Sequence, residues 1–336
     1  MDNSVPLILN VTAADYQGAY GKSFESGFHT SLAGTSHQHT TSLKDFLSPR
    51  KEIKVIILHW PEWIQKSLNI TTEQFCALLK EWRAFNCQIG IVLHNAHPHI
   101  AETSSKFLYN AIHGIFDFAI HFEAFSHVHM KSWAKRHYLL PHPCMSLPGK
   151  PIQNHRNGIM ILGHIRHKEE YRYILKCVIA ARIARMKVFV GRFDDFRDQS
   201  FRVNQIMHVL FWRLILNAVT IRGRVPDSTL DDWREECQFM LMFRDENHLN
   251  SAIPYTALSN DFIPIGRAYT NVSACMQRFG LSHMNSTKII DLTRYFRTQK
   301  KATKPSVFSK FRKDHSLQRI STVLEEILND ELAFVQ

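Results

Sequence analysis

The chain has 336 residues, enough for two ordinary domains, and its 45% hydrophobic content excludes a disordered protein. No run of about 18 uninterrupted apolar residues occurs, so we expect no transmembrane helix. The N-terminus, MDNSVPLILNVTAADYQ, has neither a basic region nor a small-residue cleavage site, and it indicates a first strand and not a signal peptide. The formal net charge of +11 fits nucleic acid, an anionic membrane or a phosphate-bearing substrate, and composition does not choose among them.

The first half of the chain alternates apolar runs of strand length with segments of helical period, which is typical of βαβ units and a mostly parallel sheet. The predicted strands are Val5–Val11, Lys54–Trp60, Gln88–Asn95, Phe116–Phe122 and Tyr138–Pro143. One helix is predicted to begin at Thr71 or Thr72, and another covers Glu102–His113. The Gly-, Ser- and His-rich stretch Tyr16–Thr41 is predicted to be a loop.

A linker is predicted at Ser146–Asn157, which has two prolines, a glycine and mostly polar residues. The alternation then restarts, with strands predicted at Gly158–Gly163, Lys187–Gly191, Ala218–Ile221, Phe239–Phe243 and Phe262–Ile265. The end of the chain is predicted to be helical. The sequence therefore predicts an α/β protein of two domains, residues 1–148 and 149–290, followed by a basic helical tail, 291–336.

The six cysteines are scattered through the chain, and no two of them form a C-x-x-C pair. Such usage is typical of a reducing compartment, where cysteine serves as a small buried apolar residue. We therefore expect a cytoplasmic protein.

Histidines lie at the ends of four consecutive predicted strands of the first domain, at His59, His94, His121 and His142. Ligands of open parallel sheets bind at the carboxyl ends of the strands. A single histidine there is most often an ordinary side chain that meets water, but four at matching positions indicate a function. An imidazole can orient or deprotonate a hydroxyl group, or donate a hydrogen bond to a developing oxyanion.

Two segments of the second domain combine polar or basic residues with the start of a predicted helix. The first segment follows the strand GIMIL and contains Gly163, Arg166 and Lys168. The backbone N–H groups of the helix start and the two positive side chains are predicted to form an anion-binding site there. After the run FMLMF, the second segment contains Arg244, Glu246, Asn250 and Ser251. Taken alone, the first segment is also compatible with a solvated turn.

The motifs HWPEW, LHNAHPH, GHIRHK, RGRVPDSTLDDW and RDENHLNSAIPYTAL follow one another between about residues 52 and 280. In this order they resemble bacterial glycosyltransferases of the GT-B fold, in which two Rossmann-like domains face each other across a cleft. The likeness is greatest to the retaining group of exopolysaccharide and O-antigen assembly, which includes polyprenol-diphosphate-linked oligosaccharide mannosyl- and glucosyltransferases. The resemblance implies a hexosyltransferase with an N-terminal acceptor domain and a C-terminal nucleotide-sugar domain.

The resemblance also implies roles for single residues. It makes catalytic residues of His94, which approaches the donor sugar, and of Arg166 and Lys168, which hold the donor diphosphate. The implied donor-binding residues are Gly163, Arg166, Lys168, Arg244, Glu246, Asn250 and Ser251. The implied acceptor-binding residues are His59, Asn95, His97 and His99. Such an enzyme needs neither a metal nor another cofactor, because positive side chains and a helix dipole neutralise the leaving diphosphate.

Three other functions stay open. At the spacing where many retaining members have a second glutamate after Glu246, this chain has Pro254, which keeps a nucleotide-sugar epimerase or a non-catalytic scaffold in consideration. A metal-dependent hydrolase is suggested by His94, His97 and His99, but the motif lacks a carboxylate. A nucleic-acid-binding protein is suggested by the charge, although no nucleic-acid motif occurs.

The segment Arg294–Arg319 contains nine Lys or Arg residues and a single acidic one, Asp314. Its aromatic residues are Tyr295, Phe296, Phe308 and Phe311. Such a stretch is attracted to anionic lipid, and the aromatic side chains would enter the interface. One interpretation is peripheral binding to the inner face of the cell membrane, where a lipid-linked acceptor would lie. The other is a solvated helix face followed by a linker.

Overall fold

The computed structural model describes residues 7–13, 19–94, 103–123, 126, 128, 130–143, 156–162, 168–191, 213, 217–221, 225–242, 252–266, 270–282, 284, 286–302 and 305–335. They divide into two compact units. Unit 1 contains the described residues up to 143, Ala252 and the described residues from Lys313 onward, and unit 2 contains the described residues 156–242 and 253–312. The chain therefore builds most of unit 1, then unit 2, and returns to unit 1.

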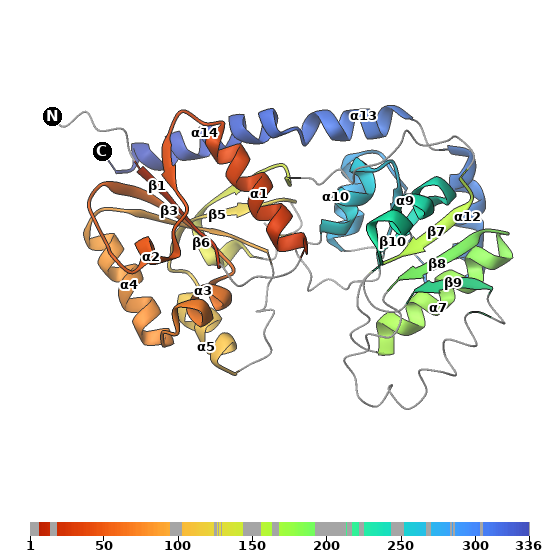
Figure 1. Cartoon of the computed structure of the whole chain (residues 1–336), viewed down its shortest axis with the longest axis horizontal. Coiled ribbons are helices and arrows are strands. Elements are labelled where there is room, and N and C mark those ends of the chain that lie inside the picture. Colours follow the sequence, from red (N-terminus) through yellow and green to blue (C-terminus); the bar gives the residue numbers. More distant parts are fainter. Residues whose placement is uncertain are drawn as a thin grey trace. The chain divides into compact units, whose positions relative to one another are not determined.

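Unit 1 is built on a six-stranded parallel sheet with the order β2-β1-β3-β4-β5-β6 (Figure 1). Its strands are β1 (Leu7–Val11), β2 (Gln38–Thr40), β3 (Ile53–His59), β4 (Gln88–Val92), β5 (Phe116–His121) and β6 (Ala134–Leu139). Strands β3, β4 and β5 are buried almost throughout, as expected for near-continuous apolar runs in a sheet covered on both faces.

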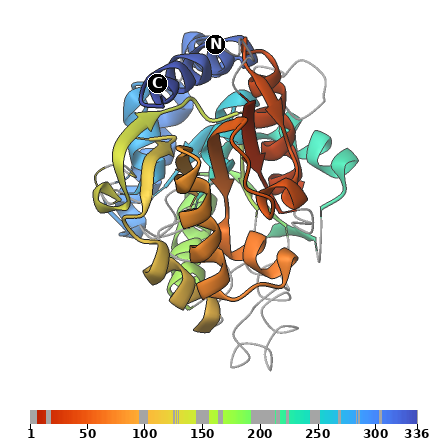
Figure 2. The same ribbon diagram turned by 90° about the vertical axis from the view of Figure 1, so that its left-hand side faces the viewer.

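Helices cover both faces of this sheet (Figures 1 and 2). One face packs against α2 (Leu43–Phe46), α3 (Pro61–Leu68), α4 (Thr72–Ala84) and α5 (Thr103–Ile112) in a single apolar core. The other face is covered by α1 (Ala19–Ala33) and by α14 (Leu317–Ala333), which pack against each other. The start of α4 confirms the sequence prediction, because Thr71 caps it in a reciprocal capping box with Gln74.

Two elements of unit 1 lie where the sequence predicts a loop. Helix α1 and strand β2 both fall within Tyr16–Thr41, so that prediction is wrong. Four glycines and several polar residues weaken the helical pattern of this stretch. The four-residue spacing of Phe24, Phe28 and Leu32 does indicate a helix, and all three side chains are fully buried.

Strand β6 begins and ends earlier than the predicted strand Tyr138–Pro143. Strand β6 is at the edge of the sheet and pairs with β5 alone. Its residues, AKRHYL, are therefore mostly polar and half-buried. Its short 3-10 turn, η1 (Lys131–Trp133), leads directly into it. A search for apolar runs therefore places this strand too far along the chain, at the prolines that follow it.

Unit 2 has a second parallel sheet with the order β11-β10-β7-β8-β9 (Figure 1). Its strands are β7 (Gly158–Ile161), β8 (Lys187–Gly191), β9 (Ala218–Ile221), β10 (Cys237–Leu241) and β11 (Ile263–Ile265). All five overlap the predicted strands, and β10 begins and ends two residues earlier than predicted. Its helices include α7 (Lys168–Ile183), α9 (Asp227–Glu236), α10 (Ala252–Ser259), α11 (Asn271–Arg278), α12 (Ile289–Ala302) and α13 (Pro305–Asp314).

The predicted tail, 291–336, does not form a separate element of structure. Helix α12 packs against α7 in unit 2, whereas α14 belongs to unit 1. Phe296, Phe308 and Phe311 are buried in the protein, so the prediction that they enter a membrane interface is wrong. The basic side chains Arg294 and Arg297 are exposed on α12. Among the described helices, none combines the length and the apolar character needed to cross a bilayer.

Candidate functional site

The carboxyl edge of the unit 1 sheet carries the four histidines that the sequence predicts there. His59 and His121 are the last residues of β3 and β5, and His94 and His142 follow β4 and β6. All four side chains are buried. The ordinary interpretation, in which each of them meets water, is therefore wrong.

The four histidines lie on two different faces of the sheet. His59 is in register with Val92, and His94 follows Val92 by two residues, so both side chains leave the same face. Val92 is in register with Ile120, which directs His121, the next residue, to the opposite face. There its Nδ1 and Nε2 atoms meet Ser126 Oγ at 3.1 Å and His137 Nδ1 at 2.7 Å.

His94 and His59 form a hydrogen-bonded chain with Asn10 of β1. His59 Nδ1 lies 3.3 Å from His94 Nε2, and His59 Nε2 lies 2.9 Å from Asn10 Oδ1. Asn10 is in register with Ile57 of β3, two residues before His59, which brings it to the same face. Both ring nitrogens of His59 are thus occupied by protein groups, which leaves neither of them for the acceptor that the resemblance implies.

Aromatic rings surround this chain. The indole of Trp60 is stacked on the imidazole of His94, with the ring centroids 3.8 Å apart and the planes at 11°. Phe24 of α1 meets the same imidazole edge to face at 4.8 Å. We call Asn10, His59, Trp60 and His94 the His94 cluster.

The backbone at Trp60 is in the left-handed region, with φ at 47° and ψ at 72°. Residues with a bulky side chain rarely adopt this conformation, which costs about 1–3 kcal/mol and persists only where surrounding contacts hold it. Pro61 begins α3 directly after it. The turn between β3 and α3 therefore holds the indole against His94 at the expense of local strain.

His142 also packs against the aromatic rings that surround the His94 cluster. Its ring meets Phe122 at 4.9 Å and Phe24 at 5.4 Å between centroids. The Nδ1 atom of His315, which follows α13, lies 3.0 Å from the backbone oxygen of His142. The segment between α13 and α14 thus contacts the edge of the sheet at which the histidines lie.

Glu25 is a titratable group of this edge that the sequence analysis missed. It follows Phe24 in α1 and is hydrogen-bonded to Thr12, directly after β1. Partial burial raises the pKa of the Glu25 carboxyl to about 7, against the opposing effect of the Thr12 hydrogen bond. Its Oε1 atom is buried without a hydrogen-bond partner among the described residues. In the sequence, Glu25 could have been found only through its position next to Phe24, which belongs to the four-residue spacing of α1.

We expect acid to destabilise the protein through His59 and His142. Burial lowers the pKa of each to about 3, and for His142 the neighbouring His315 adds to the effect. The ordinary pKa of histidine, which holds in the unfolded state, is about 6.5. Between about pH 6.5 and about pH 3 the unfolded state therefore binds more protons than the folded state, and the free energy of unfolding falls as the pH falls. From about pH 7 to about pH 5 the expected loss is about 1–2 kcal/mol per histidine.

Urea denaturation at the two pH values measures this loss. The raised pKa of Glu25 acts in the opposite direction, because that carboxyl favours the protonated form in the folded state. The comparison is therefore made in a Glu25→Gln background, with and without His142→Leu. Equal unfolding free energies at both pH values would contradict the prediction, and the second substitution should reduce the pH dependence.

Most of the other predicted site residues lie outside the described residues: Asn95, His97, His99, Gly163, Arg166, Arg244, Glu246, Asn250 and Ser251. Lys168 is the first residue of α7, so the predicted helix start after β7 is present. Likewise α10 begins at Ala252, directly after the predicted cap. Within the described part of the chain, no group of three or more His, Cys, Asp or Glu side chains is arranged to hold a metal ion.

No protein-family model and no curated protein matches the sequence. Solved structures do match the fold. HepE of Anabaena, solved with UDP-glucose, is 10% identical with a TM-score of 0.60, and the match covers 97% of this chain and 99% of that one. A glycosyltransferase of Rickettsia africae is 10% identical with a TM-score of 0.60, over 98% and 99% of the two chains. A Listeria monocytogenes structure assigned as a UDP-N-acetylglucosamine 2-epimerase is 8% identical with a TM-score of 0.56, over 98% and 97%.

These matches extend over nearly the whole of both chains, and at such low identity they show a shared fold. With the two parallel sheets they confirm the predicted class, an α/β protein of two Rossmann-like domains of the GT-B type. That the two domains face each other across a cleft stays a prediction.

Proposed function

We propose that this protein is a glycosyltransferase that moves a sugar from a nucleotide-sugar donor to a glycan or lipid-linked acceptor. The observation that carries the proposal is the full-length match to HepE, which has been solved with UDP-glucose and with UDP. The His94 cluster adds independent support, because it lies at the carboxyl edge of a parallel sheet, where such folds bind their ligands. The proposed donor class is therefore a UDP-hexose.

In this proposal the two domains divide the work. His94 contacts the transferring sugar from unit 1, with Asn95, His97 and His99 on the acceptor side. Arg166 and Lys168 of unit 2 hold the donor diphosphate at the start of α7, where helix N–H groups favour negative charge. Gly163, Arg244, Glu246, Asn250 and Ser251 complete the donor site.

The reaction proceeds without a metal ion in this proposal. Charge develops on the leaving nucleotide diphosphate, and fixed positive groups stabilise it where it develops. Arg166, Lys168 and the dipole of α7 supply those groups. We propose a retaining outcome on the resemblance to the exopolysaccharide and O-antigen group.

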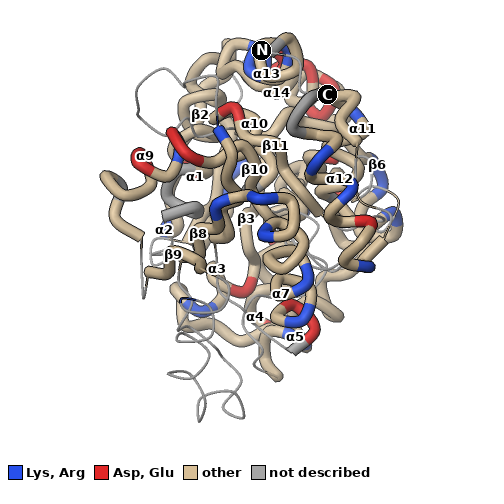
Figure 3. The backbone as a smooth tube through the Cα atoms, turned by 90° about the vertical axis from the view of Figure 1, so that its right-hand side faces the viewer, with Lys and Arg blue, Asp and Glu red and all other residues tan. Residues whose placement is uncertain are grey.

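The acceptor side of the proposal rests on charge. Figure 3 shows Lys and Arg residues along α12 and along its neighbour α7 in unit 2. We propose that these residues attract the anionic inner face of the cell membrane, where a lipid-linked acceptor of surface polysaccharide synthesis lies. The contribution is electrostatic, since the Phe residues of the same segment are buried.

A thermal-shift screen tests the donor class. We expect UDP and UDP-glucose to raise the melting temperature, because a ligand at about 100 times its Kd adds about 2.7 kcal/mol to the stability of the folded state. GDP, ADP and their sugars serve as matched controls of similar charge. Melting temperatures that none of these compounds shifts would contradict the proposal.

A nucleotide-sugar epimerase is the second candidate, favoured by the match to the Listeria structure and by Pro254 in place of a second glutamate. The two functions differ in their products. A transferase releases UDP and requires an acceptor, whereas an epimerase changes the sugar and leaves it bound to UDP. Nuclear magnetic resonance of the donor after incubation without an acceptor separates them.

A further inference from the structure

The direction of the hydrogen bonds in the His94 cluster follows from Asn10. The Oδ1 atom of Asn10 can only accept, so the hydrogen in its 2.9 Å contact belongs to His59 Nε2. A neutral imidazole has one N–H group, and His59 Nδ1 therefore carries a lone pair. In the 3.3 Å contact between the two rings, His94 Nε2 must then be the donor.

His59 is suited to this role because it stays neutral. Its side chain is fully buried, and burial lowers its pKa to about 3. At neutral pH its Nδ1 atom is consequently a fixed acceptor toward His94, and its Nε2–H group is a fixed donor toward Asn10. A charged His59 would have hydrogens on both nitrogens and would repel the Nε2–H group of His94.

We propose that Asn10 and His59 are positioning residues that hold His94 with its hydrogen on Nε2 and its basic lone pair on Nδ1. The inference rests on the proposed function in that His94 Nδ1 accepts the proton of the attacking acceptor hydroxyl. In that step the acceptor oxygen bonds to the anomeric carbon of the donor sugar, the bond from that carbon to the diphosphate breaks, and the hydroxyl proton passes to His94 Nδ1. The Nε2–H bond of His94 to His59 is kept throughout. The resulting imidazolium is stabilised by the lone pair of His59 and by the stacked face of Trp60.

Other titratable groups around His94 contribute to the pH at which it takes up a proton. From β3 the facing group is His59, and from the end of β6 it is His142, which lies behind Phe24 and Phe122. His315 acts through His142. Glu25 follows Phe24 on α1. A test therefore has to change the His59 contact alone and leave these groups in place.

Two variants of His59 differ in the acceptor that they present to His94. His59→Asn keeps an oxygen near the position of Nδ1, whereas His59→Leu removes the acceptor, and both lose the contact to Asn10. His121→Leu is the matched control, because His121 is an equally buried histidine at the same edge that faces away from His94. The full-length protein is labelled with ¹⁵N-histidine, and the His94 signals are assigned by their absence in His94→Gln.

In the wild-type protein we expect a nitrogen–nitrogen coupling through the hydrogen bond between His94 Nε2 and His59 Nδ1, with the hydrogen on His94. In titrations without substrate, His59→Leu should lower the pH at which His94 takes up a proton by about one unit, because the cation loses a hydrogen-bond acceptor. His59→Asn and His121→Leu should stay near the wild-type midpoint. A hydrogen on His59 Nδ1, or a midpoint that rises in His59→Leu, overturns the inference.

The wild-type coupling remains decisive if a variant does not fold. Transfer assays separate this inference from the proposed function. If the coupling and the midpoints are as expected but His94→Ala transfers sugar at the wild-type rate, the proposed role of His94 fails and the positioning of its ring stands. If transfer depends on His94 but the hydrogen lies on His59 Nδ1, the positioning inference fails and the transferase stands. In the pH profile of kcat/KM, the acidic limb should move with the His94 midpoint.

Discussion

We expect substitution of His94 by alanine to lower the kcat of the proposed sugar transfer by about 10²–10⁴-fold, the range typical of a lost acid or base side chain. The physical reason is the loss of a buried imidazole that Trp60 and His59 hold in one orientation at the carboxyl edge of the sheet. The measurement is the release of UDP from a UDP-sugar in the presence of acceptor. The donor-induced thermal shift should be retained, because the proposed diphosphate site is in unit 2.

His121→Ala is the control for this prediction. It also removes a buried histidine from the end of a neighbouring strand, and it should cost stability without changing kcat, since the ring faces Ser126 and His137. Near wild-type kcat in His94→Ala would remove His94 from the mechanism. Equal losses in both variants would show that any damage to this edge of the sheet impairs transfer.

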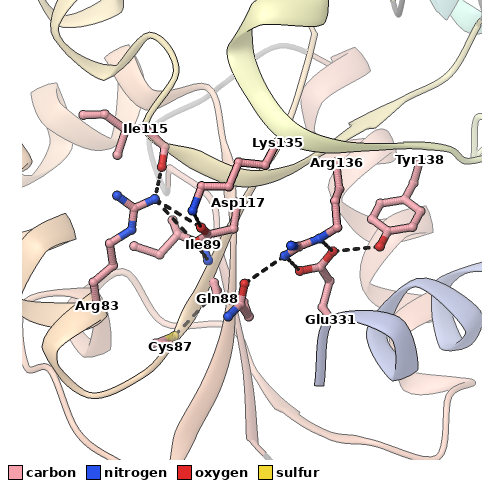
Figure 4. Close-up of polar contacts among 10 residues, drawn as sticks. All are labelled: Arg83, Cys87, Gln88, Ile89, Ile115, Asp117, Lys135, Arg136, Tyr138 and Glu331. Atoms are coloured by element: carbon pink, nitrogen blue, oxygen red, sulfur yellow. Dashed lines mark hydrogen bonds and ion pairs between the residues drawn. The ribbon is translucent and has the colours of Figure 1, made fainter. Parts of the chain in front are cut away.

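Substitution of Glu331 by alanine lowers the free energy of unfolding of unit 1 by about 3–5 kcal/mol. Glu331 lies on α14, is fully buried and accepts hydrogen bonds from Arg136 and Tyr138 of β6 (Figure 4). The Arg136 contacts are bidentate, at 2.8 Å to Oε1 and 2.5 Å to Oε2, and the Tyr138 hydroxyl donates to Oε1 at 2.8 Å. The alanine variant leaves the Tyr138 phenol without its acceptor, and of the two side-chain acceptors of the partly buried Arg136 guanidinium only Gln88 Oε1 remains.

Urea denaturation monitored by the fluorescence of Trp82 and Trp133 measures this loss, because both indoles lie in the core of unit 1. Glu326→Ala is the matched control: it makes the same change on the same helix at an exposed position, and it should alter stability by less than about 0.5 kcal/mol. Glu331→Gln, which keeps the size and one acceptor, should fall between the two. Equal losses for Glu331→Ala and Glu326→Ala would show that the ion pair does not hold α14.

The sheets could be predicted from the sequence because buried parallel strands are continuous apolar runs. This rule placed β3, β4 and β5 and all five strands of unit 2. It failed at the edges of unit 1, where β2 and β6 are short or polar. It also missed α1, whose three buried apolar residues are separated by glycine and polar residues.

The site could be predicted in part. Strand ends show where His59 and His94 lie, but the separation of His121 from them depends on the register between strands, which a list of apolar runs does not contain. Asn10 gave a weak signal, as a polar residue inside the apolar strand LILNV. The left-handed backbone of Trp60 gave none, because its conformation is imposed by surrounding contacts and not by its own preference.

The return of α14 to unit 1 has a consequence for how the protein is made. Arg136 and Glu331 are 195 residues apart in the chain. At a translation rate of about 5–20 residues per second, about 10–40 s separate the synthesis of one from that of the other. During this interval most of unit 1 has emerged from the ribosome, but one face of its sheet still lacks α14. Unit 1 therefore cannot finish folding before unit 2 has been translated, and its nascent form offers an apolar surface to chaperones.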